Sequence, residues 1–262
     1  MDKPHISFAG AGRVAASLCK ELYRSGYTVD MVVSRTEKNG ESLAGSVSAM
    51  WSQNLIFPET TGLIIVAVPD NTLENVLNGI ECDRNVVVAH TAGSYGTDVF
   101  PEKIRKKGVF YPLQTFSAGR SINFTEVPFL LESADEETCK VLFEVASTLS
   151  DKIFFTDTEH RRMIHLAAVF ACNFTNHMLT AGNEIVRNAG FQMNILEPLV
   201  RETLSKALEQ GPERSQTGPA FRNDTITIEK QLSLLSSNPE FKQLYTSVTQ
   251  SIIEYYKNRT SD

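Results

Sequence analysis

The sequence predicts an α/β protein whose first part is a doubly wound parallel sheet and whose second part is all α. Three observations support this. Apolar runs alternate with helix-like patterns over residues 1–155, a glycine-rich turn follows the first run, and only helix-like patterns follow Asp157. We therefore place a domain boundary near residue 155, which gives domains at 1–155 and 156–262.

The predicted strands of the first domain are short apolar runs. Several are apolar at every position, as expected for strands covered on both faces by helices. Helix-like patterns lie between them, and this alternation favours parallel strands joined by helical crossovers. The runs are 5–10, 28–35, 63–69, 85–90, 108–113, 128–133 and 152–157, and the helices are 13–25, 37–44, 72–78 and 136–149.

The second domain begins with one long predicted helix. Thr156 and Glu159 have the spacing of a capping box, and Gly190 follows Asn188 as a stop signal. We expect this helix to be largely buried because of its length. Three shorter helices should follow, beginning after Asn194, near Asp224 and at Asn238–Pro239.

The composition excludes several classes of protein. The chain has 262 residues, is 42% hydrophobic and carries a formal net charge of -6. We expect no nucleic-acid binding, because no long basic run is present. We also expect no membrane span, because none of the runs approaches about 18 apolar residues. No leader pattern is seen, and the four scattered cysteines lack C-x-x-C spacing, so a reduced, cytoplasmic protein is expected.

The turn after the first strand has the spacing of a dinucleotide-binding fingerprint. Gly10 would form the tight turn, Gly12 would let a pyrophosphate approach the backbone, and Ala15 would allow close packing of helix and strand. The phosphates would bind at the helix N-terminus, where free N–H groups favour anions. The predicted cofactor-binding residues of this Rossmann-like turn are Gly10, Ala11, Gly12, Arg13 and Val14.

The end of the second strand indicates which dinucleotide binds. An NAD site has a carboxylate there, but this strand ends in Ser34-Arg35, and Asp30 lies too early. A hydroxyl and a guanidinium suit a 2′-phosphate. We therefore expect NADP(H) rather than NAD(H); the alternative is that Arg35 is only a solvated surface charge.

Two later strand ends fit the same crevice, because ligands of open α/β sheets bind at the carboxyl ends of strands. Val68 and Pro69 end one strand, and His90 and Thr91 end the next. His90 would then lie near the nicotinamide as a proton donor or acceptor. The alternative is a histidine that only orders its own loop.

Three polar residues of the second domain are further candidates for a catalytic role. Asn173 and Asn176 interrupt an otherwise apolar helix and need polar partners. They would line a pocket, or else form a polar contact in a dimer core. Arg222 follows a rigid Gly-Pro turn and could bind an anionic substrate. No histidine pair has the spacing of a metal site, so no metal is predicted.

The segments GAGRVAASL, VVSRT, AVPD, HTAGS, FYPLQTFS and TGPAFRNDTITIEKQL together resemble a bacterial family of NADP oxidoreductases with no settled substrate. This resemblance implies a Rossmann-like domain followed by a helical domain of unknown function. That helical domain is similar to the C-terminal, dimerising domain of the 6-phosphogluconate dehydrogenase superfamily, which includes pyrroline-5-carboxylate reductase. The resemblance therefore also implies a homodimer formed through the helical domain.

The chain departs from the β-hydroxyacid dehydrogenases of that superfamily, which place a catalytic lysine on the long helix. No lysine lies between Lys152 and Lys206. We expect an NADP-dependent oxidoreductase that transfers hydride to or from a small keto acid, hydroxy acid or imine held between the domains. A prephenate-dehydrogenase-like oxidation using His90 is one form of this hypothesis. The alternatives are a non-catalytic NADP(H)-binding sensor or scaffold and a Rossmann protein that binds another nucleotide.

Overall fold

A computed structural model describes residues 3–117 and 119–257. The chain divides into two compact units, Met1–Val169 and Phe170–Asp262. This division lies inside a helical segment, whereas the sequence boundary at 155 lies before that segment. The difference arises because the first turns of the helix belong to the sheet unit.

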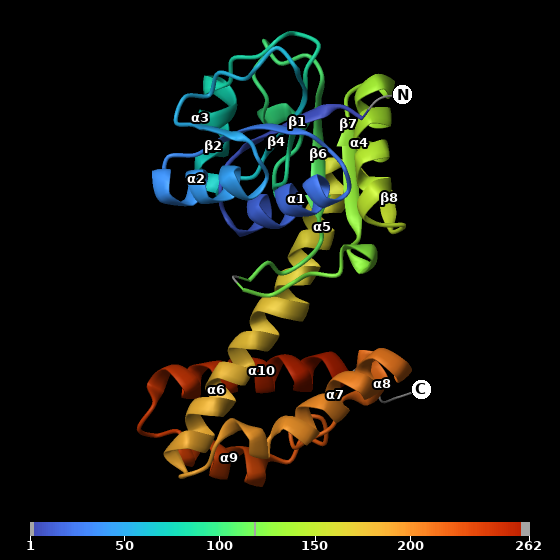
Figure 1. The fold of residues 1–262 in the computed structure, drawn as a ribbon. Helices are drawn as coiled ribbons and strands as arrows, with labels where there is room; N and C mark the ends of the chain where they lie inside the picture. The colour runs from blue at the N-terminus through green and yellow to red at the C-terminus, as the bar shows by residue number, and fades with distance from the viewer. Residues whose placement is uncertain (1–2, 118, 258–262) are drawn as a thin grey trace. The chain divides into compact units, whose positions relative to one another are not determined.

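The first unit contains one sheet of eight strands within the described residues, in the order β3-β2-β1-β4-β5-β6-β7-β8 (Figure 1). Neighbouring strands are parallel except β6 and β7. The order reverses direction between β1 and β4, which is the usual place for a ligand in a doubly wound sheet. The strands are β1 (His5–Ala9), β2 (Val29–Val33), β3 (Met50–Ser52), β4 (Thr61–Val66), β5 (Val87–His90), β6 (Lys107–Pro112), β7 (Phe129–Ser133) and β8 (Ile153–Phe155).

Two details of the sheet differ from the sequence prediction. β7 is antiparallel to β6, because the chain between them contains a loop and a short 3-10 turn, Phe124–Glu126, in place of a crossover helix. The three-residue strand β3 was not predicted, since a run this short has no readable periodicity.

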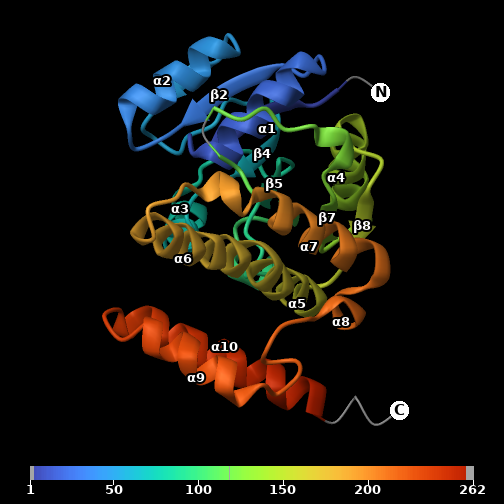
Figure 2. The same ribbon diagram turned by 90° about the horizontal axis from the view of Figure 1, so that it is seen from below.

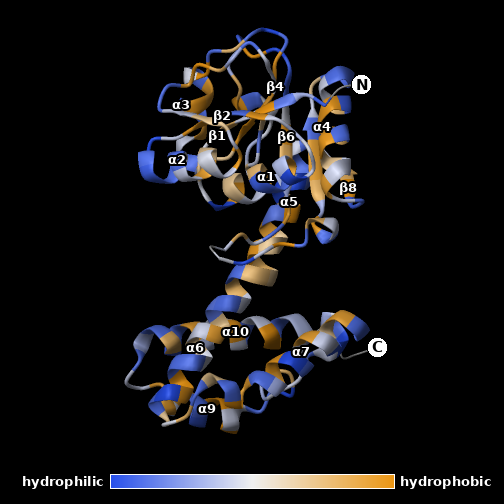
Figure 3. Ribbon diagram, viewed as in Figure 1, coloured by the Kyte–Doolittle hydropathy of each residue, from blue (hydrophilic) through white to orange (hydrophobic). Residues whose placement is uncertain are grey.

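Helices cover both faces of the sheet. The helices α1 (Arg13–Arg24), α2 (Glu37–Ser46) and α4 (Glu136–Leu149) contribute to one core cluster, and α3 (Asp70–Gly79) contributes to the other. Figure 3 shows mainly hydrophobic residues along the strands and a largely hydrophilic α2. On α1 the buried residues recur every three or four positions, so one stripe of the helix packs on the sheet, as expected from its pattern. They are Ala15, Leu18, Cys19 and Leu22.

The long predicted helix is helical throughout but is not a regular α-helix. It consists of α5 (Thr158–Ala168), a π-helical segment (Val169–Phe174) and α6 (Thr175–Asn188). The cap also differs, because the carboxylate of Asp157 accepts a hydrogen bond from the His160 amide at 2.8 Å. Asp157, rather than the predicted Thr156, is therefore the N-cap.

The second unit is helical throughout its described elements, as predicted. After α6 it contains α7 (Glu197–Gln210), α8 (Pro212–Ser215), α9 (Thr225–Leu234) and α10 (Pro239–Lys257). Figure 2 shows α9 and α10 side by side. The predicted starts near Asp224 and Asn238 are confirmed, because both side chains accept a capping hydrogen bond from the backbone. Within the described residues, no helix is long and apolar enough to cross a membrane.

Candidate functional site

A cavity of about 450 Å³ lies at the carboxyl ends of β1, β2 and β4. This is the edge of the sheet at which the strand order reverses, so the cavity has the position of a nucleotide groove. Most of the predicted cofactor-binding residues line it, whereas Arg13, Val14 and Thr91 do not. The predicted residues in its wall are Gly10, Ala11, Gly12, Ser34, Arg35, Val68 and Pro69.

Different structural reasons explain why glycine occupies each of two positions in the turn. Gly10 has a φ of +119°, and a Cβ atom there would lie 2.2 Å from the carbonyl oxygen of Ala67. Gly10 is therefore required where the turn packs against the chain after β4. A Cβ atom at Gly12 would meet nothing within 4 Å, so that position faces open space. The space at Gly12 fits a group that approaches the backbone closely.

The N-terminus of α1 suits a diphosphate. No side chain caps it, and no acidic residue occupies its first turn. Its leading N–H groups and the helix dipole therefore favour a negatively charged ligand. Arg13 lies in this first turn and lines a neighbouring groove, whereas Val14 packs against the core.

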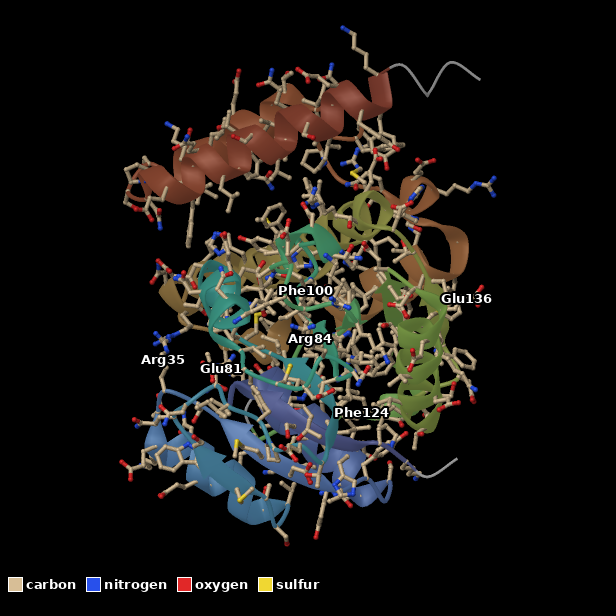
Figure 4. The ribbon with its side chains drawn as sticks, turned by 90° about the horizontal axis from the view of Figure 1, so that it is seen from above. Arg35, Glu81, Arg84, Phe100, Phe124 and Glu136 are labelled. Atoms are coloured by element: carbon tan, nitrogen blue, oxygen red, sulfur yellow. The ribbon has the colours of Figure 1, made fainter. Side chains whose placement is uncertain are left out.

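The part of the cavity that follows β2 contains one charged side chain, Arg35, and no carboxylate lines the cavity. Arg35 is exposed and makes no hydrogen bond or ion pair within the described part of the chain; Figure 4 shows its side chain. The Ser34 hydroxyl accepts from the Trp51 indole at 3.2 Å and donates to the Thr36 carbonyl at 3.0 Å. Asp30 instead contacts His5 at 2.8 Å. This arrangement fits a 2′-phosphate better than a bare ribose.

His90 is fully buried and lies between its own loop and Phe100. Its Nε2 donates to the Gly96 carbonyl oxygen, and its Nδ1 accepts from the Ala92 amide, both at 3.2 Å. Burial lowers the pKa of His90 to about 4. Because both ring nitrogens are engaged by backbone, the predicted acid–base role of His90 is not supported. The geometry instead supports the alternative, a histidine that orders its loop; the adjacent Thr91 amide bonds the Val66 carbonyl.

A polar cluster lies near the carboxyl ends of β4, β5 and β6. The Ser94 hydroxyl donates to the Asp70 carboxylate. The hydroxyl of Tyr111, on β6, lies 2.8 Å from Nδ1 of His165, on α5. Gly93 makes room for this contact, because a Cβ atom there would lie 2.6 Å from Nδ1 of His165. No local sequence pattern indicates that Tyr111 and His165 meet, because they lie 54 residues apart.

The start of α5 is fixed to the sheet unit by charged and polar contacts. Arg161 is fully buried, forms an ion pair with Glu132 on β7, and donates to the Tyr95 carbonyl. The Thr158 hydroxyl donates to Glu132 at 2.8 Å, and Arg162 donates to the Ser94 carbonyl at 2.7 Å. These contacts determine where α5 places His165.

The other predicted site residues lie in the second unit. Asn173 is exposed in the π-helical segment, Asn176 is exposed on α6, and Arg222 is exposed before α9. Asp224 acts as a cap, because its carboxylate accepts from the amide and hydroxyl of Thr227. The roles of Asn173, Asn176 and Arg222 stay predictions.

The fold and the groove define a dinucleotide-binding α/β protein. The family described as "NADP oxidoreductase coenzyme F420-dependent" matches residues 5–93, and the family described as "Domain of unknown function (DUF2520)" matches residues 127–252. The crystal structure of "putative NADP oxidoreductase BF3122" from Bacteroides fragilis is 38% identical, covers 97% of this chain and 98% of that one, and has a TM-score of 0.88. The chain belongs to this family of NADP oxidoreductases with a C-terminal DUF2520 domain.

Two more distant structures share the fold. Protein TM1727 from Thermotoga maritima is 21% identical, with a TM-score of 0.70 over 97% of this chain and 99% of that one. A reductive aminase from Aspergillus terreus, in complex with NADPH and ethyl-5-oxohexanoate, is 13% identical, with a TM-score of 0.71 over 97% and 95%. No curated protein matches the chain. The predicted family, fold class and cofactor class are confirmed.

Proposed function

We propose that the protein is an NADP(H)-dependent oxidoreductase that transfers a hydride between the nicotinamide and a small polar substrate with a carbonyl or imine group. The observation that most supports this is the groove at the strand ends, whose only charged lining residue within the described chain is Arg35. The groove lies beside the uncapped N-terminus of α1, and this combination fits a dinucleotide that carries a 2′-phosphate.

Each part of the groove would bind a different part of the cofactor, and the bound nicotinamide supplies the hydride chemistry. Gly12 and the first N–H groups of α1 would hold the diphosphate. The Ser34 hydroxyl, oriented by Trp51, and the Arg35 guanidinium would hold the 2′-phosphate. Val68 and Pro69 would form the apolar wall beside the ribose and adenine.

The substrate class rests on two supports. The polar cluster of Ser94, Tyr111 and His165 follows the ends of the strands next to the groove, where a reacting carbonyl or imine needs hydrogen-bond donors. The reductive aminase that shares this fold is in complex with NADPH and a keto ester. Both favour reduction or formation of a C=O or C=N bond.

The first test is calorimetric titration with NADPH, NADH, NADP⁺ and NAD⁺ at one salt concentration. We expect NADPH to bind at least about 10-fold more tightly than NADH, and Arg35→Asp to remove this preference. Arg84→Asp makes the same charge change before β5, away from the groove, and is the matched control (Figure 4). NADPH affinity that survives Arg35→Asp would overturn the 2′-phosphate assignment.

The second test is single-turnover oxidation of bound NADPH by pyruvate, by cyclohexanone with methylamine, and by a cyclic imine. Hydride transfer to one of them is the expected result. Tight NADPH binding with no transfer to any of the three would contradict the enzyme proposal and favour an NADP(H)-binding sensor or scaffold.

A further inference from the structure

We propose that Tyr111 and His165 form the acid–base pair of this protein, with Tyr111 giving its proton to the substrate oxygen or nitrogen and His165 restoring it. This inference rests on the proposed function, and it assigns the proton half of the reaction to two residues of the sheet unit.

The geometry is that of a proton relay. The Tyr111 hydroxyl and Nδ1 of His165 are 2.8 Å apart, and the two rings meet edge to face with centroids 5.8 Å apart. Both side chains are half-buried, so a substrate or solvent can reach them. Tyr111 lies near the carboxyl end of β6, two strands from β4, at the edge of the sheet where the groove opens.

The other polar groups of the cluster are engaged elsewhere. His90 has both ring nitrogens bonded to backbone. The hydroxyl of Ser94 donates to Asp70. Because Nδ1 of His165 can donate to the phenol oxygen, the Tyr111 O–H can point at a substrate. In this cluster, Tyr111 is thus the residue whose hydroxyl proton is free for a substrate when His165 acts as the donor.

The electrostatic surroundings favour a protonated phenol. Burial raises the pKa of Tyr111 above its ordinary value, and the negative charge of Asp70 raises it further, while Arg161 acts in the opposite direction. A phenol with a raised pKa keeps its proton at neutral pH. Tyr111 therefore carries a proton at neutral pH that it can give to a substrate heteroatom.

The hydride and the proton come from different donors, the bound nicotinamide and Tyr111. The hydride forms a C–H bond at the substrate carbon, and the π electron pair of the C=O or C=N bond moves to the heteroatom. The O–H bond of Tyr111 breaks, and its proton bonds to that heteroatom. The phenolate then takes the Nδ1 proton of His165 as Nε2 takes a proton from water. The sum is one hydride and one solvent proton added to the substrate; Tyr111 is restored, and His165 regains its Nδ1–H tautomer by exchanging its ring protons with solvent.

Two features hold the pair in place. Gly93 allows the loop after β5 to pass next to both rings, since a Cβ atom there would lie 2.6 Å from His165 Nδ1 and 3.0 Å from Tyr111 Cζ. The buried Arg161, one helical turn before His165, anchors α5 to Glu132. Arg161 is a positioning residue in this account, because it acts on the reaction through His165.

The experiment compares Tyr111→Phe and His165→Asn with two matched controls. These are Tyr27→Phe, whose hydroxyl lies 3.1 Å from the Thr148 hydroxyl, and His160→Asn, on the same helix as His165. For each protein we would measure NADPH affinity, the single-turnover rate against pH with the best substrate of the panel above, and the ¹⁵N shifts of the His165 ring. Tyr111→Phe should lower the rate roughly 100-fold with unchanged NADPH affinity. His165→Asn, which can still bond the hydroxyl, should remove one limb of the pH profile.

The outcomes separate the two proposals. If the wild-type protein does not bind NADPH, or binds it and transfers no hydride, the proposed function and this inference both fail. If the wild type turns over and Tyr111→Phe matches it across the pH range, only the acid–base assignment fails. His165 ¹⁵N shifts that do not respond to Tyr111→Phe would overturn the pairing without any substrate. Both controls should behave as wild type.

Discussion

Two glycines of one turn illustrate how differently neighbouring residues can contribute. Gly10 is tied to the packing of the sheet, because its Cβ position overlaps the backbone of Ala67. Gly12 faces open space with an extended backbone, φ -77° and ψ -173°, which any residue can adopt. The first glycine is thus explained by folding, and the second by a ligand.

This difference predicts opposite results for two alanine substitutions. Gly10→Ala should lower the free energy of unfolding by more than about 2 kcal/mol, since the added methyl group meets backbone and the φ is positive. Gly12→Ala should change stability by less than about 0.5 kcal/mol and weaken NADPH binding at least about 10-fold. Urea unfolding and calorimetric titration of both variants would check this; normal NADPH affinity in Gly12→Ala would argue against a diphosphate at that position.

His90 should make the stability of the sheet unit depend on pH. Its pKa is about 4 in the folded protein and about 6.5 in the unfolded chain, so the unfolded chain takes up the proton first. The contribution of His90 is therefore complete above about pH 6.5 and is lost as the pH falls toward 4, by at most about 3 kcal/mol. Urea unfolding between these pH values should show this slope in the wild type. The slope should be smaller in His90→Asn; equal slopes would contradict it.

At the scale of elements, α5 is the helix whose position matters most to the site. Its attachment depends on the ion pair of Arg161 and Glu132, in which Arg161 is fully buried. Within the described residues, Nε of Arg161 has no hydrogen-bond partner. The buried positive charge of the guanidinium is therefore balanced by the Glu132 carboxylate and the Tyr95 carbonyl oxygen, which accept from its other nitrogens. Removing one partner would leave the other charge buried and uncompensated.

A double-mutant cycle tests this attachment. Glu132→Gln and Arg161→Met should each lower the free energy of unfolding by about 3–5 kcal/mol, and the double variant should lose clearly less than the sum. The measurement is urea unfolding of the four proteins. Additive losses would mean that the two charges do not depend on each other.

Most elements could be predicted because their signals are local. The apolar runs and the Gly10–Gly12 turn each specify their own backbone, and Asp224 and Asn238 cap the helices that follow them. The strand β3 was missed because three residues carry no period. The π-helical segment was missed because its residues have an ordinary helical pattern, and the antiparallel β7 because strand direction depends on the whole connection.

The candidate site also has a part that the sequence predicts and a part that it does not. The cofactor groove could be predicted, since Gly12, Ser34 and Arg35 lie at strand ends that the sequence identifies. The pairing of Tyr111 with His165 joins positions 54 residues apart, and only the packing of α5 on the sheet brings them together. His90, whose position at a strand end suggests a catalytic role, is instead buried against its own loop and Phe100, which the sequence does not indicate.

At the scale of the whole molecule, the π-helical segment at the start of the second unit presents exposed apolar side chains. Phe170 and Phe174 are 62% and 48% exposed. Apolar groups at this density on consecutive turns are typical of a surface that associates. We propose that a second copy of the chain covers this segment in a homodimer.

The dimer proposal predicts a molecular mass of two chains in analytical ultracentrifugation. Phe170→Glu should shift the equilibrium toward monomers, since a charge would have to be buried in the interface. The exposed Phe191→Glu, elsewhere in the second unit, is the matched control and should remain dimeric. A monomeric wild type would overturn the proposal.

The pair of Glu132 and Arg161 also has an evolutionary consequence. Either single replacement would strongly lower the free energy of unfolding. The ion pair can therefore be lost in evolution only if both residues change almost together, or if a stabilising mutation elsewhere comes first. The two positions should therefore covary among homologues, with charged pairs and apolar pairs common and mixed pairs rare. Selection on folding would in this way also preserve the placement of α5, and with it the residues that α5 presents to the site.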